Sequence, residues 1–117
     1  MARLTAGLRV RAYLRQMQSR GGFGTVLRHG EETAGDILLK VRPVGADGRG
    51  GIDVYAQASL ADGQRGWMRL GRPGFADEAA ADAAIARAVN RDPDLWVLEL
   101  EPNRAGFPLD EPLLPES

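Results

Sequence analysis

The sequence predicts one α+β domain of two layers, in which two helices pack on one face of a mostly antiparallel five-stranded sheet. Apolar residues recur at helical spacing near residues 10 and 85, whereas five shorter segments alternate apolar and polar residues. Turn-forming residues separate most of these shorter segments. Together the segments give the order α-β-β-β-β-α-β, which is typical of an α+β domain.

The first helix is expected over about residues 5–20. Thr5 is a candidate N-cap because its hydroxyl can accept from a free backbone N–H group, and Gly21-Gly22 ends the helix. The apolar face consists of Val10, Tyr13, Leu14 and Met17. The opposite face is cationic, with Arg11 and Arg15 beside Gln18. The helix is therefore amphipathic, with a basic outer stripe.

Four strands are expected between the two helices. Their ranges are Phe23–Arg28, Asp36–Arg42, Ile52–Ala58 and Gly66–Leu70. Turn-rich connections follow the first three strands, at residues 29–35, at Asp47-Gly48 and at Asp62-Gly63. Arg72-Pro73-Gly74 is expected to break the fourth strand. Short strands at this spacing predict an antiparallel meander.

A second helix is expected from Glu78 to about Asn90, with Asp77 as its N-cap. Asp92-Pro93 ends it, and a fifth strand follows over Leu95–Glu101. The residues of that strand expected in the core are Trp96, Leu98 and Leu100. With both helices on one face, the other sheet face is expected to be partly solvated. Its expected side chains are Lys40, Arg42, Asp53, Tyr55, Gln57, Glu99 and Glu101.

We expect a domain over residues 1–101 and an irregular, proline-rich tail over residues 102–117. Four prolines in the tail exclude a regular helix or a central strand. The tail also carries apolar side chains, namely Phe107, Leu109, Leu113 and Leu114. Two packings stay open: the tail covers an apolar patch or a sheet edge of its own domain, or it binds in a groove of a second chain. Simple disorder is the third outcome.

Charge is sorted along the chain. The first thirty residues hold six arginines and no acid, whereas the last twenty-six hold seven acids and one arginine. The formal net charge is only -1. We therefore expect the first helix and the acidic last segment to be neighbours, with Arg11 and Arg15 near acids that follow Asp92. Each exposed pair would contribute roughly 0–1 kcal/mol, so its role is in docking specificity.

Composition excludes several classes of protein. The chain has no cysteine, which rules out disulfides and thiolate chemistry and fits a reducing cytoplasm. No apolar run reaches the ~20 residues of a membrane helix, and no signal peptide is expected. A nucleophile-elbow serine motif is absent, and the glycine-rich residues 45–51 lack the Gly-Lys-Ser/Thr end of a phosphate loop. We expect a cytoplasmic protein with no evident catalytic site and no cofactor.

Three segments are similar to those of the domain of unknown function 1491 family (DUF1491), small proteins of alphaproteobacteria. These segments are Val10–Arg15, Arg28–Val41 and Arg91–Glu101. They span nearly the whole chain. The resemblance implies a single bacterial domain and implies no activity or site residue.

Three functions stay open. The sequence favours an interaction or assembly module that binds an unidentified protein partner or a second copy of itself, as in a homodimer. Its candidate surface consists of Arg11, Arg15, Lys40, Arg42, Tyr55, Glu99 and Glu101. A small enzyme or metal-binding protein would use the turn that contains His29, Glu31, Glu32 and Asp36. A nucleic-acid binder would use the first-helix arginines, although the pI near 5.8 and the lack of interleaved aromatics argue against it.

Overall fold

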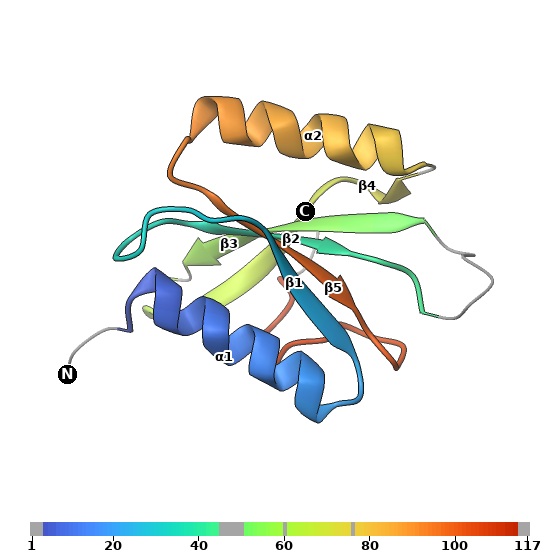
Figure 1. The fold of residues 1–117 in the computed structure, drawn as a ribbon, viewed down its shortest axis with the longest axis horizontal. Coiled ribbons are helices and arrows are strands. Elements are labelled where there is room, and N and C mark those ends of the chain that lie inside the picture. The colour runs from blue at the N-terminus through green and yellow to red at the C-terminus, as the bar shows by residue number, and fades with distance from the viewer. Residues whose placement is uncertain (1–3, 45–50, 60, 76, 115–117) are drawn as a thin grey trace.

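The computed structural model describes residues 4–44, 51–59, 61–75 and 77–114. The predicted order of elements is confirmed (Figure 1). The elements are α1 (Ala6–Ser19), β1 (Phe23–Arg28), β2 (Ile37–Val41), β3 (Ile52–Ser59), β4 (Arg65–Phe75), α2 (Glu78–Arg91) and β5 (Trp96–Glu101). The predicted turn at Asp47-Gly48 lies outside the described residues.

Both helix N-caps are the residues that the sequence predicts. The Thr5 hydroxyl accepts from the backbone N–H of Leu8 at 3.3 Å, and the Asp77 carboxylate accepts from that of Ala80 at 2.7 Å. Helix α1 ends at Ser19 with Arg20 as its C-cap, and Gly21 follows with a φ of 78°, a value that favours glycine. Each helix therefore starts where its cap satisfies a free backbone donor.

The five strands form one mixed sheet in the order β1-β5-β2-β3-β4. Three neighbouring pairs are antiparallel, and the central pair of β2 and β5 is parallel. Helix α2 makes this parallel pair possible, because it carries the chain from the edge strand β4 back to the middle of the sheet. The sheet is thus mostly antiparallel, as predicted, but it is not a simple meander.

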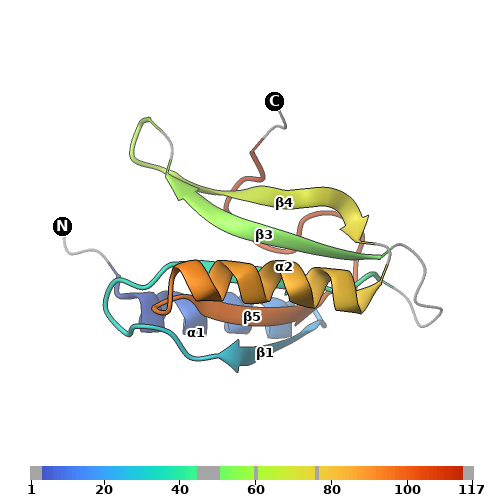
Figure 2. The ribbon, with the colours of Figure 1, turned by 90° about the horizontal axis from the view of Figure 1, so that it is seen from above.

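The prediction that both helices share one face of the sheet is wrong. Helices α1 and α2 lie on opposite sides of the sheet (Figures 1 and 2). The reason is that β2 and β5 carry buried apolar side chains on both faces. On the α2 side these are Leu38 and Val97, each 2% exposed. A central strand that is apolar on both faces needs a cover on each of them.

Two hydrophobic cores result. The core beneath α1 includes Val10, Tyr13, Met17, Ile37, Leu39, Trp67, Trp96, Leu98 and Leu100. The core beneath α2 includes Leu38, Ile52, Val54, Ala81, Ile85, Ala88, Leu95 and Val97. The predicted burial of Trp96, Leu98 and Leu100 is confirmed, since their exposed fractions are 3%, 0% and 0%.

The predicted solvated face is divided between the two sides of the sheet, which corrects the expectation of one polar face. Lys40 pairs with Val54, whereas Leu39 pairs with Tyr55. Directly paired residues of neighbouring strands share a face. The side chains of Lys40, Arg42, Glu99 and Glu101 therefore lie on the α2 side, and those of Asp53, Tyr55 and Gln57 lie on the α1 side.

Strand β4 is longer than predicted, because Arg72-Pro73-Gly74 does not break it. After Gly71, whose φ is 68°, pairing with β3 resumes where Phe75 lies opposite Ile52. Strand β4 is an edge strand, so Pro73 can lie within it without removing a hydrogen bond between two central strands.

The tail packs against its own domain, which is the first of the two predicted packings. Pro112 O accepts from the backbone N–H of Trp67 at 2.9 Å, and the N–H of Leu114 donates to Trp67 O at 2.8 Å. The tail thereby pairs with the outer edge of β4. Leu109 is buried, and the Phe107 ring meets that of Tyr55 edge-on at 5.0 Å. The tail thus completes the α1-side core over β3 and β4.

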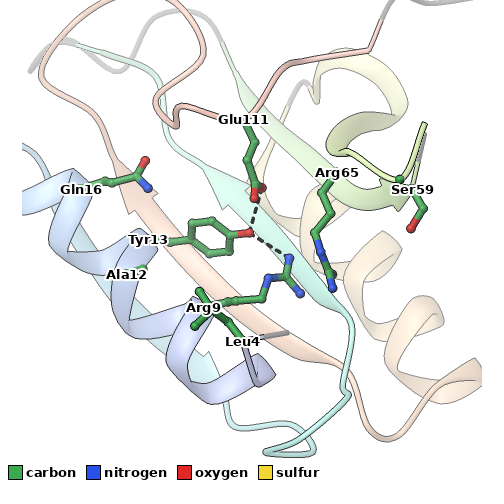
Figure 3. Close-up of a pocket in the computed structure, with 9 residues that line it drawn as sticks. Leu4, Arg9, Ala12, Tyr13, Gln16, Ser59, Arg65 and Glu111 are labelled. Atoms are coloured by element: carbon green, nitrogen blue, oxygen red, sulfur yellow. Dashed lines mark hydrogen bonds between the residues drawn. The ribbon is translucent and has the colours of Figure 1, made fainter. Parts of the chain in front are cut away.

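The basic first helix and the acidic tail are neighbours, but through residues other than Arg11 and Arg15. Arg20 donates to Asp110. The Tyr13 hydroxyl donates to Glu111 at 2.8 Å (Figure 3). The ion-pair partner of Arg11 is instead Glu32 at 3.7 Å, and Arg15 forms no ion pair within the described part of the chain. The N-terminal helix and the C-terminal tail therefore meet only along the side of α1 that carries Tyr13.

Replacing Trp96 with alanine is expected to lower the free energy of unfolding by about 3–5 kcal/mol, because a large buried side chain leaves a cavity. The substitution also removes the hydrogen bond from the indole Nε1 to Glu31 O at 2.8 Å. Urea unfolding followed by circular dichroism measures the change. Phe23→Ala, at an aromatic that is 70% exposed, is the control and should change stability by less than about 1 kcal/mol.

Truncation after Glu101 is expected to lower the thermal midpoint, because it uncovers Trp67, which is fully buried in the full chain. Differential scanning calorimetry measures the midpoint, and light scattering measures the mass in solution. Leu109→Ala, a milder change to the same packing, should lower the midpoint by less. An unchanged midpoint and mass after truncation would show that the tail neither packs nor assembles.

Candidate interaction surface

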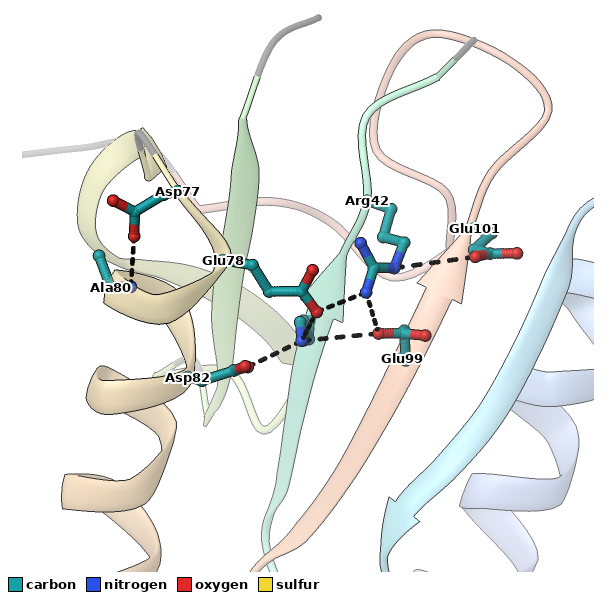
Figure 4. A network of polar contacts seen from close by, with 8 residues as sticks. Arg42, Asp77, Glu78, Ala80, Asp82, Glu99 and Glu101 are labelled. Atoms are coloured by element: carbon teal, nitrogen blue, oxygen red, sulfur yellow. Dashed lines mark hydrogen bonds and ion pairs between the residues drawn. The ribbon is translucent and has the colours of Figure 1, made fainter. Parts of the chain in front are cut away.

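The seven residues of the predicted interaction surface lie in three places. Lys40, Arg42, Glu99 and Glu101 come together beneath the first turn of α2. Figure 4 shows Arg42 linked to Glu78, Glu99 and Glu101. Tyr55 lies on the opposite face of the sheet, in the α1-side core. Arg11 and Arg15 are exposed on α1. The fold therefore does not bring all seven onto one surface.

Lys40 is the centre of the cluster beneath α2. Its side chain is only 4% exposed, and its Nζ donates to Glu78 Oε2 at 2.6 Å and to Asp82 Oδ1 at 2.7 Å. Glu78 and Asp82 are four residues apart in the first turns of α2, so both carboxylates lie on the same helix face. The buried ammonium group of Lys40 thus favours packing of the first turns of α2 above it, because those turns carry both carboxylates.

Arg42 connects this cluster to β5. It pairs with Glu78 at 2.5 Å, with Glu99 at 3.1 Å and with Glu101 at 3.7 Å. Glu99 also lies 3.6 Å from Lys40 Nζ. Every charged group of this network faces an opposite charge within the molecule, which reduces what it can offer to a partner.

The network changes the pKa of its members. The hydrogen bonds from Arg42 and Lys40 lower the pKa of Glu78 from its ordinary 4.5 to about 2. Burial by itself lowers the pKa of Lys40, but the hydrogen bonds to Asp82 and Glu78 outweigh it and raise that pKa. The hydrogen bonds to Glu78 and Glu99 raise the pKa of Arg42. These three groups are therefore charged at neutral pH.

Tyr55 is 5% exposed, which leaves little of its ring for a partner. Arg69 Nη2 lies 3.4 Å from its hydroxyl, and the tail residue Phe107 covers one edge of its ring. Burial is the main cause of the raised pKa of Tyr55. Contact of Tyr55 with a partner would require the tail to move.

The turn after β1 has a structural role in joining α1 to β5. The Glu31 carboxylate accepts from the backbone N–H groups of Ala34 and Thr33, which lowers its pKa. The His29 ring packs on Trp96, with 4.1 Å between centroids. Backbone carbonyls of Thr33 and Glu32 accept from the first N–H groups of α1, at 3.0 and 2.9 Å.

The same turn was the candidate for metal or acid–base chemistry. Across the described ranges, no three His, Asp or Glu side chains are arranged to hold a metal ion. The Glu32 carboxylate is 3.5 Å from His29 Nε2 and 3.7 Å from Arg11, and it lies against Gly7 at the start of α1. Its position at a helix N-terminus stabilises the helix electrostatically.

The feature that the sequence reasoning missed is the outer edge of β1. Strand β1 ends the sheet, and in the described part of the chain no backbone group pairs with its outer side. Three of its apolar side chains are exposed, with Phe23 at 70%, Leu27 at 50% and Val26 at 36%. The signal was present in the sequence, because residues 23–27 contain neither a charge nor a proline, the residues that usually protect an edge strand.

Helix α1 places its basic stripe on this side of the molecule. Leu14 packs against Gly24, where an added Cβ would lie 2.7 Å from Leu14 Cδ2. Successive helical residues are about 100° apart, so Gln18, Arg11 and Arg15 follow Leu14 around the helix on the β1 side. A hollow of about 160 Å³ lies here, lined by Leu14, Gln18, Gly22, Phe23 and Gly24.

The fold and this surface define a small α+β protein with a mixed sheet between two helices, one bare sheet edge and a tail folded back on its own domain. No helix in the described ranges is long and apolar enough to span a membrane. Residues 4–110 match the family described as protein of unknown function (DUF1491), and the chain belongs to that family.

Solved structures agree with this assignment. A crystal structure of a DUF1491 family protein from Caulobacter crescentus CB15 shares 35% identity, with a TM-score of 0.81 over 96% of this chain and all of that one. An NMR structure of a DUF1491 family protein from the same organism gives 33% identity and a TM-score of 0.80, over 98% of this chain and all of that one. Protein Atu0922 from A. tumefaciens shares 27% identity, with a TM-score of 0.76 over 99% of this chain and all of that one. No curated protein matches the chain.

The ion network beneath α2 predicts loss of stability in acid. Because the pKa of Glu78 is about 2 in the folded protein and 4.5 ordinarily, its contribution is present above pH 4.5 and is lost as the pH falls toward 2. Glu78→Gln should flatten this part of the stability profile. Urea midpoints between pH 2 and pH 7 measure it. Asp94→Asn, which changes an exposed carboxylate without an ion pair in the described residues, should leave the profile as it is.

Proposed function

We propose that this protein is an interaction module that receives an extended segment of a partner protein along the outer edge of β1. The observation that carries the proposal is the unpaired edge of β1 with its exposed Phe23, Val26 and Leu27. An edge strand offers a row of free backbone N–H and C=O groups, and addition of a strand satisfies them. The exposed side chains would gain apolar contacts in the same step.

Charge complementarity indicates the chemistry of the partner. Side chains of an added strand alternate between the two faces of the sheet. Side chains of the added strand on the α1 side would approach the stripe that contains Arg11 and Arg15. Phe23 faces the α2 side, because it pairs with Glu101, which lies on that side. Side chains of the added strand on the α2 side would therefore lie next to Phe23. A segment that alternates acidic and apolar residues satisfies both faces.

A second copy of the chain fits this edge less well. Two β1 strands that pair antiparallel about a two-fold axis would form one continuous sheet, with both copies of α1 on the same face. The two basic stripes would then approach each other, which is unfavourable. The acidic tail of the chain itself is already bound elsewhere, through Arg20 and Tyr13.

The test uses two fluorescein-labelled eight-residue peptides, one alternating glutamate and valine and the other alternating lysine and valine. We expect the glutamate peptide to bind more tightly, and the Arg11→Glu/Arg15→Glu double variant to reverse the preference. Leu27→Asp should weaken binding of the glutamate peptide at least tenfold, because a carboxylate on the edge strand repels the acidic side chains and opposes apolar contact. Fluorescence anisotropy measures binding, and amide shifts in β1 locate it.

Met68→Asp is the matched control, because Met68 is 49% exposed on β4, at the other end of the sheet. It should leave peptide binding unchanged. Equal binding of both peptides, or no shift in β1, would contradict the proposal. A dimer in sedimentation experiments that Leu27→Asp dissociates would also contradict the proposal, since the occupant of the edge would then be a second copy.

A further inference from the structure

A cleft of about 450 Å³ lies on the side of α1 away from β1, between the helix, the end of the β3–β4 hairpin and the tail. Its polar lining consists of Arg9, Tyr13, Gln16, Ser59, Arg65 and Glu111 (Figure 3). A second hollow of about 420 Å³ adjoins it and shares Arg9, Ser59 and Arg65 with it. This region is separate from the β1 edge and takes no part in the proposed strand addition.

Arg9 is a buried cation that lacks an ion pair among the described residues. It is 7% exposed, and its Nη2 donates to the Tyr13 hydroxyl at 2.9 Å. Its guanidinium carbon also lies 5.7 Å from the centroid of the Tyr13 ring. A hydroxyl and an aromatic ring compensate a buried charge only in part. The remaining N–H groups of Arg9 are therefore suited to an anion that enters the cleft.

Arg65 brings a second cation to the same space. It comes from the start of β4, and Figure 3 shows both its guanidinium group and that of Arg9 directed into the cleft. Arg65 likewise forms no ion pair within the described residues. Two like charges in one cavity repel each other, and an anion between them converts this repulsion into attraction.

The tail and α1 hold the other polar groups of the cleft in place. The Tyr13 hydroxyl donates to Glu111 at 2.8 Å and accepts from Gln57 Nε2 at 3.2 Å. Burial, and then the hydrogen bond to Glu111, raise the pKa of Tyr13, so it is protonated at neutral pH. Gln16 Oε1 accepts from the backbone N–H of Asp110 at 3.1 Å, which leaves the amide N–H groups of Gln16 free to donate.

We propose that this cleft binds the phosphate group of a small metabolite, with Arg9 and Arg65 as its charged ligands. The planar guanidinium group presents two parallel donors that match two phosphate oxygens. A phosphate is tetrahedral, so it can meet donors that converge from α1 and from β4 at once. A carboxylate carries a single charge and has two oxygens in one plane, so it matches donors that converge from two directions less well.

Glu111 sets the strength of this site. With Arg9 and Arg65 it gives the cleft a net charge of +1, and its carboxylate repels a phosphate. Glu111→Gln keeps an oxygen that can accept from Tyr13 while it removes the negative charge. The substitution should therefore tighten phosphate binding by about tenfold, whereas Arg65→Gln should weaken it by a similar factor.

The probes are inorganic phosphate, glycerol phosphate and succinate, each titrated into the full chain at constant ionic strength and followed by NMR. We expect saturable shifts for both phosphates at residues that line the cleft, and weaker binding of succinate. Arg87→Gln is the control, because Arg87 is exposed on α2, across the sheet from the cleft. It should leave the affinity unchanged.

Arg65→Gln and Glu111→Gln change partly exposed residues, so both variants are expected to fold even where Arg9→Gln does not. Three results would overturn the proposal: no saturable shift in the cleft, equal weakening by Arg87→Gln and Arg65→Gln, or succinate binding as tightly as glycerol phosphate. Weaker phosphate binding by Glu111→Gln would also overturn it, since the carboxylate would then assist the ligand.

Discussion

Strand β5 enters the sheet between β1 and β2, parallel to β2, and this insertion buries both faces of the central strands. All five residues of β2 are buried. A sheet of this kind requires a cover on each side. Helix α1 contacts β1 and β5 on one side, and α2 contacts β3 and β4 on the other. The tail fills the place that α1 leaves open over β3 and β4, whereas nothing described pairs with the outer edge of β1.

The same two-sided burial explains the ion network. Lys40 lies on a central strand, where its side chain is only 4% exposed. A buried ammonium group needs carboxylates within hydrogen-bond distance, and Glu78 and Asp82 provide them from the start of α2. The charge therefore favours one position of α2 over others that would bury as much apolar surface. Arg42 extends the network to β5, so strand and helix positions are fixed together.

Helix α1 has two polar sides, one with exposed arginines and one with a buried arginine. On the side of β1, Arg11 and Arg15 are exposed beside a bare strand edge. On the other side, Arg9 is buried beside Tyr13 and the tail. The charge asymmetry of the sequence therefore has two components. Arg20 attaches the tail through Asp110, whereas Arg11 and Arg15 stay exposed on the surface.

Local patterns of residues were sufficient to predict the element types, the two N-caps and the core face of β5, because all of these depend on contacts within a few residues. Alternation in Leu95–Glu101 was sufficient to place Trp96 in the core. Tertiary structure decided the sides on which the helices lie, the partners of Lys40, the return of the tail to β4 and the cleft around Arg9. Local periodicity predicts which residues of one strand share a face. The strand order and register decide which residues of neighbouring strands lie on the same face of the sheet. The register places Tyr55 with Leu39 and away from Lys40.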